Sequence, residues 1–308
     1  MSELNSVDTA LLEVIAEMKN GAAPGAYNIR KDSGCAGRMN TENVVITSKE
    51  DKPGIDITFA PGCKETCHIP VIITESGLKE TVYNDFYVGE GADVLIIAGC
   101  GIHNCGEDAS EHDGIHAFHI GKNAKVKYVE KHYGEGDGLG ENIMNPTTIA
   151  ELDEGASLQM DTSQIAGIDS TRRDTRIICA AGAEVVVTER LLTHGKQHAD
   201  SDMEIVLNGA DSKGRVISRS VAQDDSVQVF RPRVVGNAKC FGHVQCDSII
   251  MGSAKISSVP EIAANDIDAQ LIHEAAIGRI AGDQLLKLET LGLTPEEAED
   301  RILKGFLA

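Results

Sequence analysis

A short turn element recurs through the middle of this chain at a nearly constant spacing. Each copy is a Gly-Ala, Asn-Ala or Ser-Ala step, and most copies lead into an apolar strand such as ADVLIIA, AKVKYVE or AEVVVTE. Successive alanines are 32, 32, 27, 27, 28 and 16 residues apart; they are Ala92, Ala124, Ala156, Ala183, Ala210, Ala238 and Ala254. A turn repeated at this period between short strands is typical of a solenoid, in which each coil is one repeat.

The composition favours a parallel β-helix as the form of this solenoid. The chain has 31 glycines, no tryptophan and 4% aromatic residues, so small and β-branched side chains have to build the core. Gly or Asn at the tight corners permits a positive φ. The alternative is a β-sandwich, which predicts Asn-Gly or Asp-Gly hairpin loops about every 8–12 residues. Asn208-Gly209 and Asp137-Gly138 are isolated cases, so the spacing favours the β-helix.

The N-terminal segment predicts one amphipathic helix over residues 1–20. Leu11, Leu12, Val14, Ile15 and Met18 lie on or near one face of that helix. Residues 21–54 are rich in Gly, Pro and other turn formers, and we expect them to be mostly loop. Strand-like sequence then continues from about residue 55 to residue 262.

The C-terminal segment predicts a helical hairpin. Leucines at i, i+3 and i+6 from residue 285 precede Gly292, a residue type that ends helices. Thr294, Pro295 and Glu297 then form a capping-box pattern that starts a second helix over residues 295–304. We therefore divide the chain into an N-terminal helix and loop region (1–54), a β-helix core (55–265) and a C-terminal helical region (266–308).

Charge and targeting signals limit the partners and the compartment. A net charge of −20 repels phosphate backbones and anionic lipid surfaces, so we expect neither a nucleic-acid nor a membrane partner. Residues 1–20 have no signal-peptide pattern, and no apolar run approaches the ~20 residues of a membrane span. Eight cysteines then fit free thiols or metal ligands in a cytoplasmic protein better than disulfides.

A cluster of thiols and imidazoles in the first half of the chain offers one metal-site hypothesis. Its members are Cys63, Cys67, His68, Cys100, His103, Cys105, His112, His116 and His119. Neighbouring coils of a solenoid lie about 5 Å apart, so such residues could converge on one zinc or iron ion. The resulting alternative is a zinc- or iron-dependent metalloenzyme. The other interpretation is that the cysteines are small buried apolar residues.

A second hypothesis concerns Cys246. Six residues separate it from Cys240, which places both on the same strand face but roughly 20 Å apart, too far to share an ion. His243 has an odd offset and faces the other way. Cys246 therefore needs partners from another segment, and His273-Glu274, at the junction of the strand region and the helical tail, supplies an imidazole and a carboxylate. Such a mixed set suits iron, although an ordinary surface His-Glu pair gives the same pattern.

The sequence has no ATP-binding motif of its own. The glycine-rich stretch from Gly134 to Gly140 has no following Lys-Ser/Thr pair, and it carries Glu135 and Asp137, which would repel a phosphate. We expect this stretch to be a loop.

Short strings in the C-terminal third follow one another in a fixed order. They are Gln245-Cys246-Asp247-Ser248, Val259-Pro260-Glu261-Ile262, Asp268-Ala269, His273-Glu274-Ala275, Gly278-Arg279-Ile280, Gln284-Leu285, Gly292-Leu293, Glu297-Ala298 and Gly305-Phe306, preceded by Glu189-Arg190 and Ser218-Arg219-Ser220. This order resembles the core domain of the SufB/SufD family, and the resemblance covers about residues 55–308.

The resemblance implies a right-handed β-helix with helical ends that acts as a scaffold rather than an enzyme. A transient iron–sulfur cluster would be assembled on it and passed to apoprotein clients. Cys246 matches the family's sulfur acceptor or cluster ligand, and His273 and Glu274 match the neighbouring ligand candidates. Cys63, Cys67, Cys100, His103 and Cys105 remain alternative metal ligands.

The resemblance also implies partners. These are a second copy joined through the β-helix edges, a SufC-type ABC ATPase bound through residues 280–308, and a sulfur donor. It admits a reduced flavin, for which we find no motif. Because the chain is shorter than full-length members, it resembles the short subunit of a minimal SUF system, in which one protein works as a homodimer.

Overall fold

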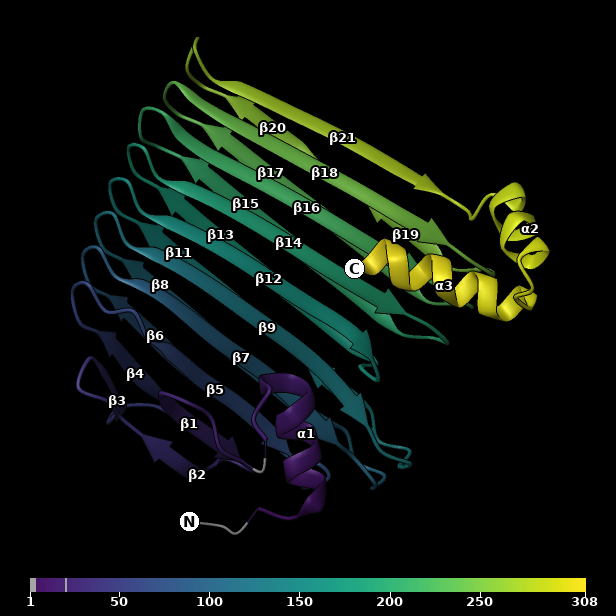
Figure 1. Ribbon diagram of the computed structural model, residues 1–308, viewed down its shortest axis with the longest axis horizontal. Helices are drawn as coiled ribbons and strands as arrows, with labels where there is room; N and C mark the ends of the chain where they lie inside the picture. Colours follow the sequence, from purple (N-terminus) through teal and green to yellow (C-terminus); the bar gives the residue numbers. More distant parts are fainter. Residues whose placement is uncertain (1–3, 20) are drawn as a thin grey trace.

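The computed structural model describes residues 4–19 and 21–308, and in these residues two β-sheets pack face to face (Figure 1). The ten strands of sheet 1 are, in spatial order, β2 (Gly34–Met39), β1 (Ala26–Lys31), β5 (Thr66–Ile73), β7 (Asp93–His103), β9 (Lys125–Glu135), β12 (Ser157–Ala166), β14 (Glu184–Thr193), β16 (Ser212–Ala222), β18 (Cys240–Ile250) and β21 (Gln270–Gly278). The eleven strands of sheet 2 are β3 (Val44–Ser48), β4 (Gly54–Phe59), β6 (Lys79–Val88), β8 (Ser110–Ile120), β10 (Asn142–Met144), β11 (Thr147–Leu152), β13 (Ser170–Cys179), β15 (His198–Leu207), β17 (Val227–Gly236), β19 (Lys255–Ser258) and β20 (Glu261–Ala264).

The chain alternates between the two sheets and forms a β-solenoid of about eight turns, which confirms the predicted architecture. Coil-to-coil pairs such as β7 with β9 and β16 with β18 are parallel. Residues 21–54 do not form the expected loop: β2 pairs antiparallel with β1, and β3 pairs antiparallel with β4. These short strands lie at the N-terminal end of the solenoid.

The recurring turns stack on one another, as the sequence predicts. Gly91, Asn123, Gly155 and Gly182 have φ between +57° and +67°, and the alanine that follows each of them is fully buried. The N–H of Asn123 donates to the carbonyl oxygen of Glu154 in the next turn, at 3.0 Å. The final spacing of 16 residues is half a coil, because Ala254 precedes a strand of sheet 2, whereas the earlier turns precede strands of sheet 1.

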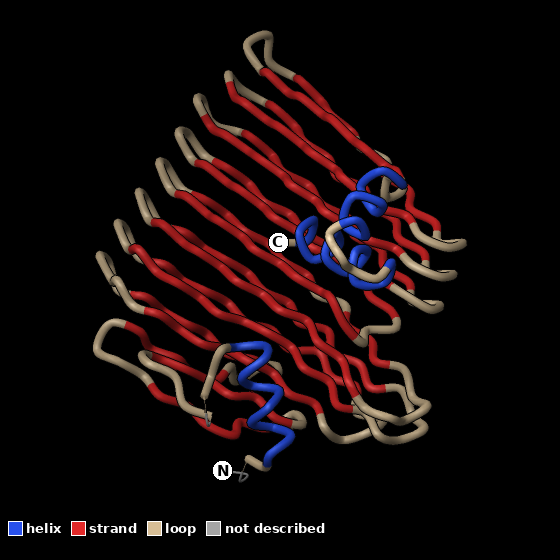
Figure 2. The backbone as a smooth tube through the Cα atoms, turned by 45° about the vertical axis from the view of Figure 1, so that its right-hand side comes forward, coloured by secondary structure: helices blue, strands red, loops and turns tan. Residues whose placement is uncertain are grey.

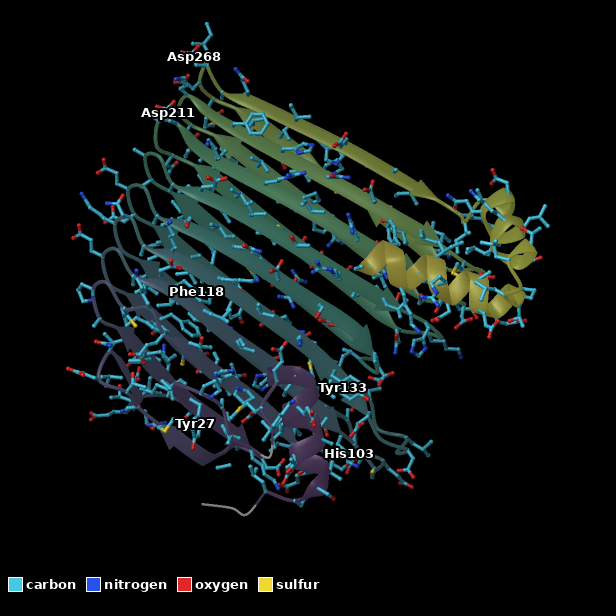
Figure 3. All side chains as sticks on the ribbon, in the orientation of Figure 1. Tyr27, His103, Phe118, Tyr133, Asp211 and Asp268 are labelled. Atoms are coloured by element: carbon cyan, nitrogen blue, oxygen red, sulfur yellow. The ribbon has the colours of Figure 1, made fainter. Side chains whose placement is uncertain are left out.

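The space between the sheets has an apolar part and a polar part. Near the stacked turns it is filled by Ile, Val, Ala and a few aromatic side chains, and the Phe86 and Phe118 rings stack with their centroids 4.3 Å apart. Figure 3 marks Phe118 in this region. Toward the other end of the strands, buried His, Glu and Arg side chains occupy the interior.

Helices α1 (Ser6–Ala16) and α3 (Pro295–Leu307) both contact the outer face of sheet 1 (Figures 1 and 2). Leu11, Leu12 and Ile15 of α1 are buried against β5 and β7. The fit needs Gly99 on β7, where an added Cβ would lie 2.4 Å from the carbonyl oxygen of Ile15. Val14, expected near the buried face, is 46% exposed. Of the predicted helix over 1–20, residues 1–3 and 20 lie outside the described residues.

The C-terminal segment differs from the expectation in one important respect. Residues 270–278, expected at the start of a helical tail, form strand β21, which pairs in parallel with β18. The hairpin follows as α2 (Gly282–Thr290) and α3. The capping box is confirmed, since the Thr294 hydroxyl accepts from the Glu297 N–H at 3.2 Å, but α3 continues past residue 304 to Leu307. None of the helices in residues 4–19 and 21–308 is long and apolar enough to cross a membrane.

Candidate functional site

Cys246 and His273 meet inside the last two strands of sheet 1. In the parallel register, Val244 lies opposite His273 and Cys246 lies opposite Ala275. Val244 and Cys246 face inward and are buried, so His273 also faces inward and lies diagonally across from the thiol. The Sγ atom of Cys246 is 3.7 Å from Nε2 of His273. The structure therefore brings together the thiol and the imidazole that the sequence proposed as partners.

Glu274 does not join this pair. Successive side chains of a strand point to opposite faces, so Glu274 lies on the outer face of sheet 1. There its Oε1 is 2.9 Å from Nε2 of His243, the residue predicted to face away from Cys246. Cys240 is buried on the same strand face as Cys246, as predicted. The expected three-residue set is thus divided into an inner pair and an outer pair.

Burial sets the protonation of the inner pair. Cys246 is 2% exposed, and burial raises its pKa to about 11, although the nearby Ser258 hydroxyl acts in the opposite direction. Burial also lowers the pKa of His273, opposed by the nearby Glu274. At neutral pH the pair therefore holds a thiol proton and a neutral imidazole. Neutral imidazole is the metal-binding form, whereas the thiol must lose its proton when a metal binds.

A row of polar side chains in sheet 1 ends at Cys246. One residue from each successive strand, at the same height, faces inward: Glu130, Thr162, Glu189, Ser218 and then Cys246. All of them are buried. At about 4.8 Å per strand, the row extends roughly 19 Å along the solenoid.

Arg173 of sheet 2 connects this row across the interior. Its Nη1 is 2.7 Å from Oε2 of Glu130, and its Nε is 3.7 Å from Oε1 of Glu189. The hydroxyl of Ser218 donates to Glu189 at 3.4 Å. Buried charges need such partners. Neither Glu130 nor Arg173 was predicted from the sequence, in which the available signal is a charged residue at an inward position of an alternating strand.

The cysteines proposed for the alternative metal site lie in separate environments. Cys63 and Cys67 are part of the apolar interior near the stacked turns, where burial raises the pKa of Cys67 to about 12. Cys100 belongs to a different buried cluster, with Val71 and Ile102. Burial holds the Cys100 pKa well above its ordinary value. These three residues therefore behave as small buried apolar side chains.

The histidines of that proposal do not gather at one point either, although His112 and His116 line the same small cavity as Cys100. His68 is buried beneath α1, and His112 contacts Glu80 at 3.1 Å. The other three positions are His116, 2.7 Å from the Tyr128 hydroxyl, His119, stacked on Tyr87 at the surface, and His103, 3.0 Å from the Cys105 sulfur. Within the described residues, no three His, Cys, Asp or Glu side chains are arranged to hold one metal ion. The geometry does not support a metalloenzyme centre in this cluster.

Comparisons with known proteins identify the family of this chain. The chain is 27% identical to an iron–sulfur cluster assembly SufBD family protein of Methanocaldococcus jannaschii, over 98% of this chain and 99% of that protein. It is 28% identical to a SufBD family protein of Archaeoglobus fulgidus, covering 85% of this chain and 70% of the relative. A Methanothermobacter thermautotrophicus relative is 26% identical, and there the matched region covers only 62% of its length. The profile described as "SUF system FeS cluster assembly, SufBD core domain" matches residues 75–306, and the chain therefore belongs to the SufBD family.

Proposed function

We propose that this protein is a homodimeric scaffold on which a transient iron–sulfur cluster is assembled, with Cys246 and His273 as the donors from each chain. The cluster is its cargo and passes to apoproteins. The observation that carries the proposal is the 3.7 Å approach of the thiol and the neutral imidazole at the C-terminal end of the solenoid. A sulfur donor supplies sulfide, while the flavin admitted by the resemblance is not part of the proposal.

The end of the solenoid that holds this pair is uncovered. Ile277 of β21 and Ile262 of β20 occupy inward positions, opposite the buried Ser248 and Val234, yet they are 44% and 47% exposed. β21 is the last strand of sheet 1, so one edge of its backbone is unpaired within the described chain. Exposed strand edges with apolar side chains readily add another strand. We propose a second copy of this chain as that partner.

A two-fold dimer also completes the ligand set. One chain supplies two inner donors, whereas an iron–sulfur cluster of two or four irons is generally held by four protein ligands. A two-fold axis between the β21 strands places a second Cys246–His273 pair opposite the first, since such an interface uses the same patch twice. Glu274 remains a candidate ligand in this proposal, from the outer face.

The C-terminal hairpin is the proposed docking surface for a SufC-type ABC ATPase. Leu286 and Leu291 are exposed, and α2 has no buried residue. The end of α3 is attached to sheet 1, because Nη1 of Arg219 donates to the carbonyl oxygens of Phe306 and Ala308 at 3.3 and 3.1 Å. The neighbouring Ser218 lies opposite Cys246. Movement of residues 280–308 by the ATPase therefore has a short path to the thiol.

The assembly proposal is tested by anaerobic reconstitution of the full chain with ferrous iron and sulfide. Cys246→Ser should abolish the visible absorption of the cluster, and His273→Gln should weaken it. Cys240→Ser is the matched control, because Cys240 is buried on the same face of the same strand. An unchanged spectrum in Cys246→Ser would contradict the site assignment.

The partner proposal is tested by co-purification with the ATPase. A chain ending at residue 279 should lose the ATPase but keep the cluster spectrum, since the donors lie before that residue. Equal recovery of the ATPase by the shortened chain would exclude residues 280–308 as its docking surface.

The eight free cysteines fit a reducing compartment, and we place the assembly in the cytoplasm.

A further inference from the structure

A second thiol lies against an imidazole, far along the chain from Cys246. Cys105 is exposed, just after β7, and its Sγ is 3.0 Å from Nε2 of His103. On the other side of the ring, Nδ1 of His103 is 3.0 Å from Oε1 of Glu135 at the end of β9. The Tyr133 hydroxyl donates to Oε2 of Glu135 at 3.2 Å. Figure 3 shows His103 and Tyr133 at the same end of the solenoid, near α1.

The order of contacts fixes what each group does. An ionised carboxylate only accepts hydrogen bonds, so Nδ1 of His103 carries the proton that Glu135 receives. Nε2 then has a free lone pair directed at the Cys105 sulfur. Cys105 is therefore placed as the nucleophile, His103 as its base and Glu135 as the carboxylate that orients the base, which is the order found in cysteine and serine hydrolases. The thiol and the carboxylate contact opposite nitrogens of the ring, which is not an arrangement for holding one metal ion.

The surrounding loops hold these groups in place. Asn104 is buried; its Oδ1 accepts from the Gly106 N–H at 3.0 Å, and its Nδ2 donates to the Asp108 carbonyl oxygen at 2.9 Å. The glycine-rich stretch that follows Glu135 packs directly on this loop. Gly136 has φ +122°, and an added Cβ there would lie 2.1 Å from the Asn104 carbonyl oxygen. The glycine-rich motif thus allows the two loops to approach, and the loops position Cys105 and Glu135.

We propose that Cys105, His103 and Glu135 form a nucleophilic thiol site that attacks the S–S bond of small disulfides. His103 takes the proton from the Cys105 thiol as its sulfur attacks one sulfur of the disulfide. A bond forms between Cys105 and that sulfur, the original S–S bond breaks, and the other half leaves as a thiol with the proton from His103. The exchange conserves electrons and needs no other oxidant.

The charge around the site selects among disulfides. Glu107, Asp108 and Asp137 are exposed on the two loops beside Cys105. An anionic disulfide is repelled there and a cationic one is attracted. The preferred substrate class is therefore a cationic small disulfide. This site shares no residue with the proposed cluster site, so the two proposals stand or fall separately.

The experiment measures mixed-disulfide formation on the folded full chain by mass spectrometry of individual sites. Cys35 is the matched control, because it is also exposed but its sulfur contacts an amide oxygen, Oδ1 of Asn28, at 3.6 Å. With cystamine, Cys105 should react at least about tenfold faster than Cys35. This threshold is set below the rate enhancement of about 10²–10⁴-fold that a positioned general base commonly supplies. His103→Gln and Glu135→Gln should bring the Cys105 rate down to that of Cys35, which should itself not change.

The choice of reagent tests the substrate class. Cystamine should react with Cys105 faster than oxidised glutathione does, and added salt should reduce this preference because it screens the loop carboxylates. Equal rates for Cys105 and Cys35, or a Cys105 rate unaffected by His103→Gln, would overturn the proposed site. A preference for the anionic disulfide would overturn the proposed class. The Cys246→Ser variant should retain the full Cys105 rate.

Discussion

Replacing Arg173 by methionine tests whether the polar row beside Cys246 depends on one buried cation. Arg173 is 6% exposed and lies between two buried acids, Glu130 at 2.7 Å and Glu189 at 3.7 Å. Methionine fills a similar volume but leaves both acids without their cation. Breaking a buried ion pair from one side costs about 3–5 kcal/mol of unfolding free energy. At about 2 °C per kcal/mol for a chain of this size, the melting temperature should fall by roughly 6–10 °C.

The loss should depend on pH in a definite direction. Burial disfavours the charge on Glu130, but Arg173, followed by His132, outweighs this effect and holds the Glu130 pKa well below its ordinary 4.5. In the wild type that depressed pKa stabilises the fold above pH 4.5, and the contribution is lost only as the pH falls through the folded-state pKa. Without Arg173, burial is left largely unopposed and raises the pKa. The loss of unfolding free energy in Arg173→Met is therefore full at pH 8 and becomes smaller toward pH 5, as Glu130 takes up a proton.

Scanning calorimetry at pH 8 and pH 5 measures both effects. The control is Arg176→Met on the same strand, because Arg176 is exposed on the outer face and pairs with Glu204 at 3.0 Å. Loss of this exposed ion pair should lower the free energy of unfolding by no more than about 0.5 kcal/mol at either pH. A melting temperature for Arg173→Met equal to that of Arg176→Met, or a loss that does not shrink at pH 5, would refute this account of the buried network.

Three further perturbations have definite outcomes. Arg219→Ala removes both hydrogen bonds to the last carbonyls of α3, so amide exchange in its final turn should quicken while the melting temperature changes little. Cys246 is buried with a pKa of about 11, so iodoacetamide at pH 7.5 should label it only after urea is added; prompt labelling of the folded chain would contradict this burial. Ile277→Asp puts a charge on the uncovered end of the solenoid, so it should shift the proposed dimer toward monomer in analytical ultracentrifugation, whereas Val14→Asp at an exposed position of α1 should not.

The solenoid was predictable because its main signal is local and repeated. In four successive coils a residue with positive φ is followed by a buried alanine, so each of these coils carries the same short string in the sequence. Strand β21 was not predictable in this way. Its sequence, QLIHEAAIG, contains good helix formers, and pairing with β18 overrides their preference. The antiparallel strands before residue 54 were missed for a related reason, since their glycines and polar residues are typical of loops.

In the candidate site, too, the features that depend on a local pattern were predictable and those that depend on packing between sheets were not. The alternation of strand faces correctly predicted that Cys246 lies on the face of Cys240 and that His243 lies opposite. The same alternation separates His273 from Glu274 once residues 270–278 are known to be a strand. The contact of Arg173 with Glu130 follows no such rule, because the two residues are 43 positions apart in the chain and meet only through the way in which the two sheets face each other. Packing between layers is not encoded in a local pattern.

The protonation of the inner pair bears on how a scaffold can release its cargo. A thiol with a pKa of about 11 holds its proton at neutral pH, so in the proposed scaffold iron has to displace that proton before Cys246 can bind it. In the proposed dimer, the second copy covers Ile277 and the part of His273 that is still exposed, which would strengthen metal–thiolate bonding. Separating the two ends reverses both effects: water returns and the thiolate regains its proton. Because Arg219 joins the end of α3 to β16, which pairs with the strand that carries Cys246, a pull on the C-terminal hairpin would reach the sheet two strands away from the proposed interface at β21.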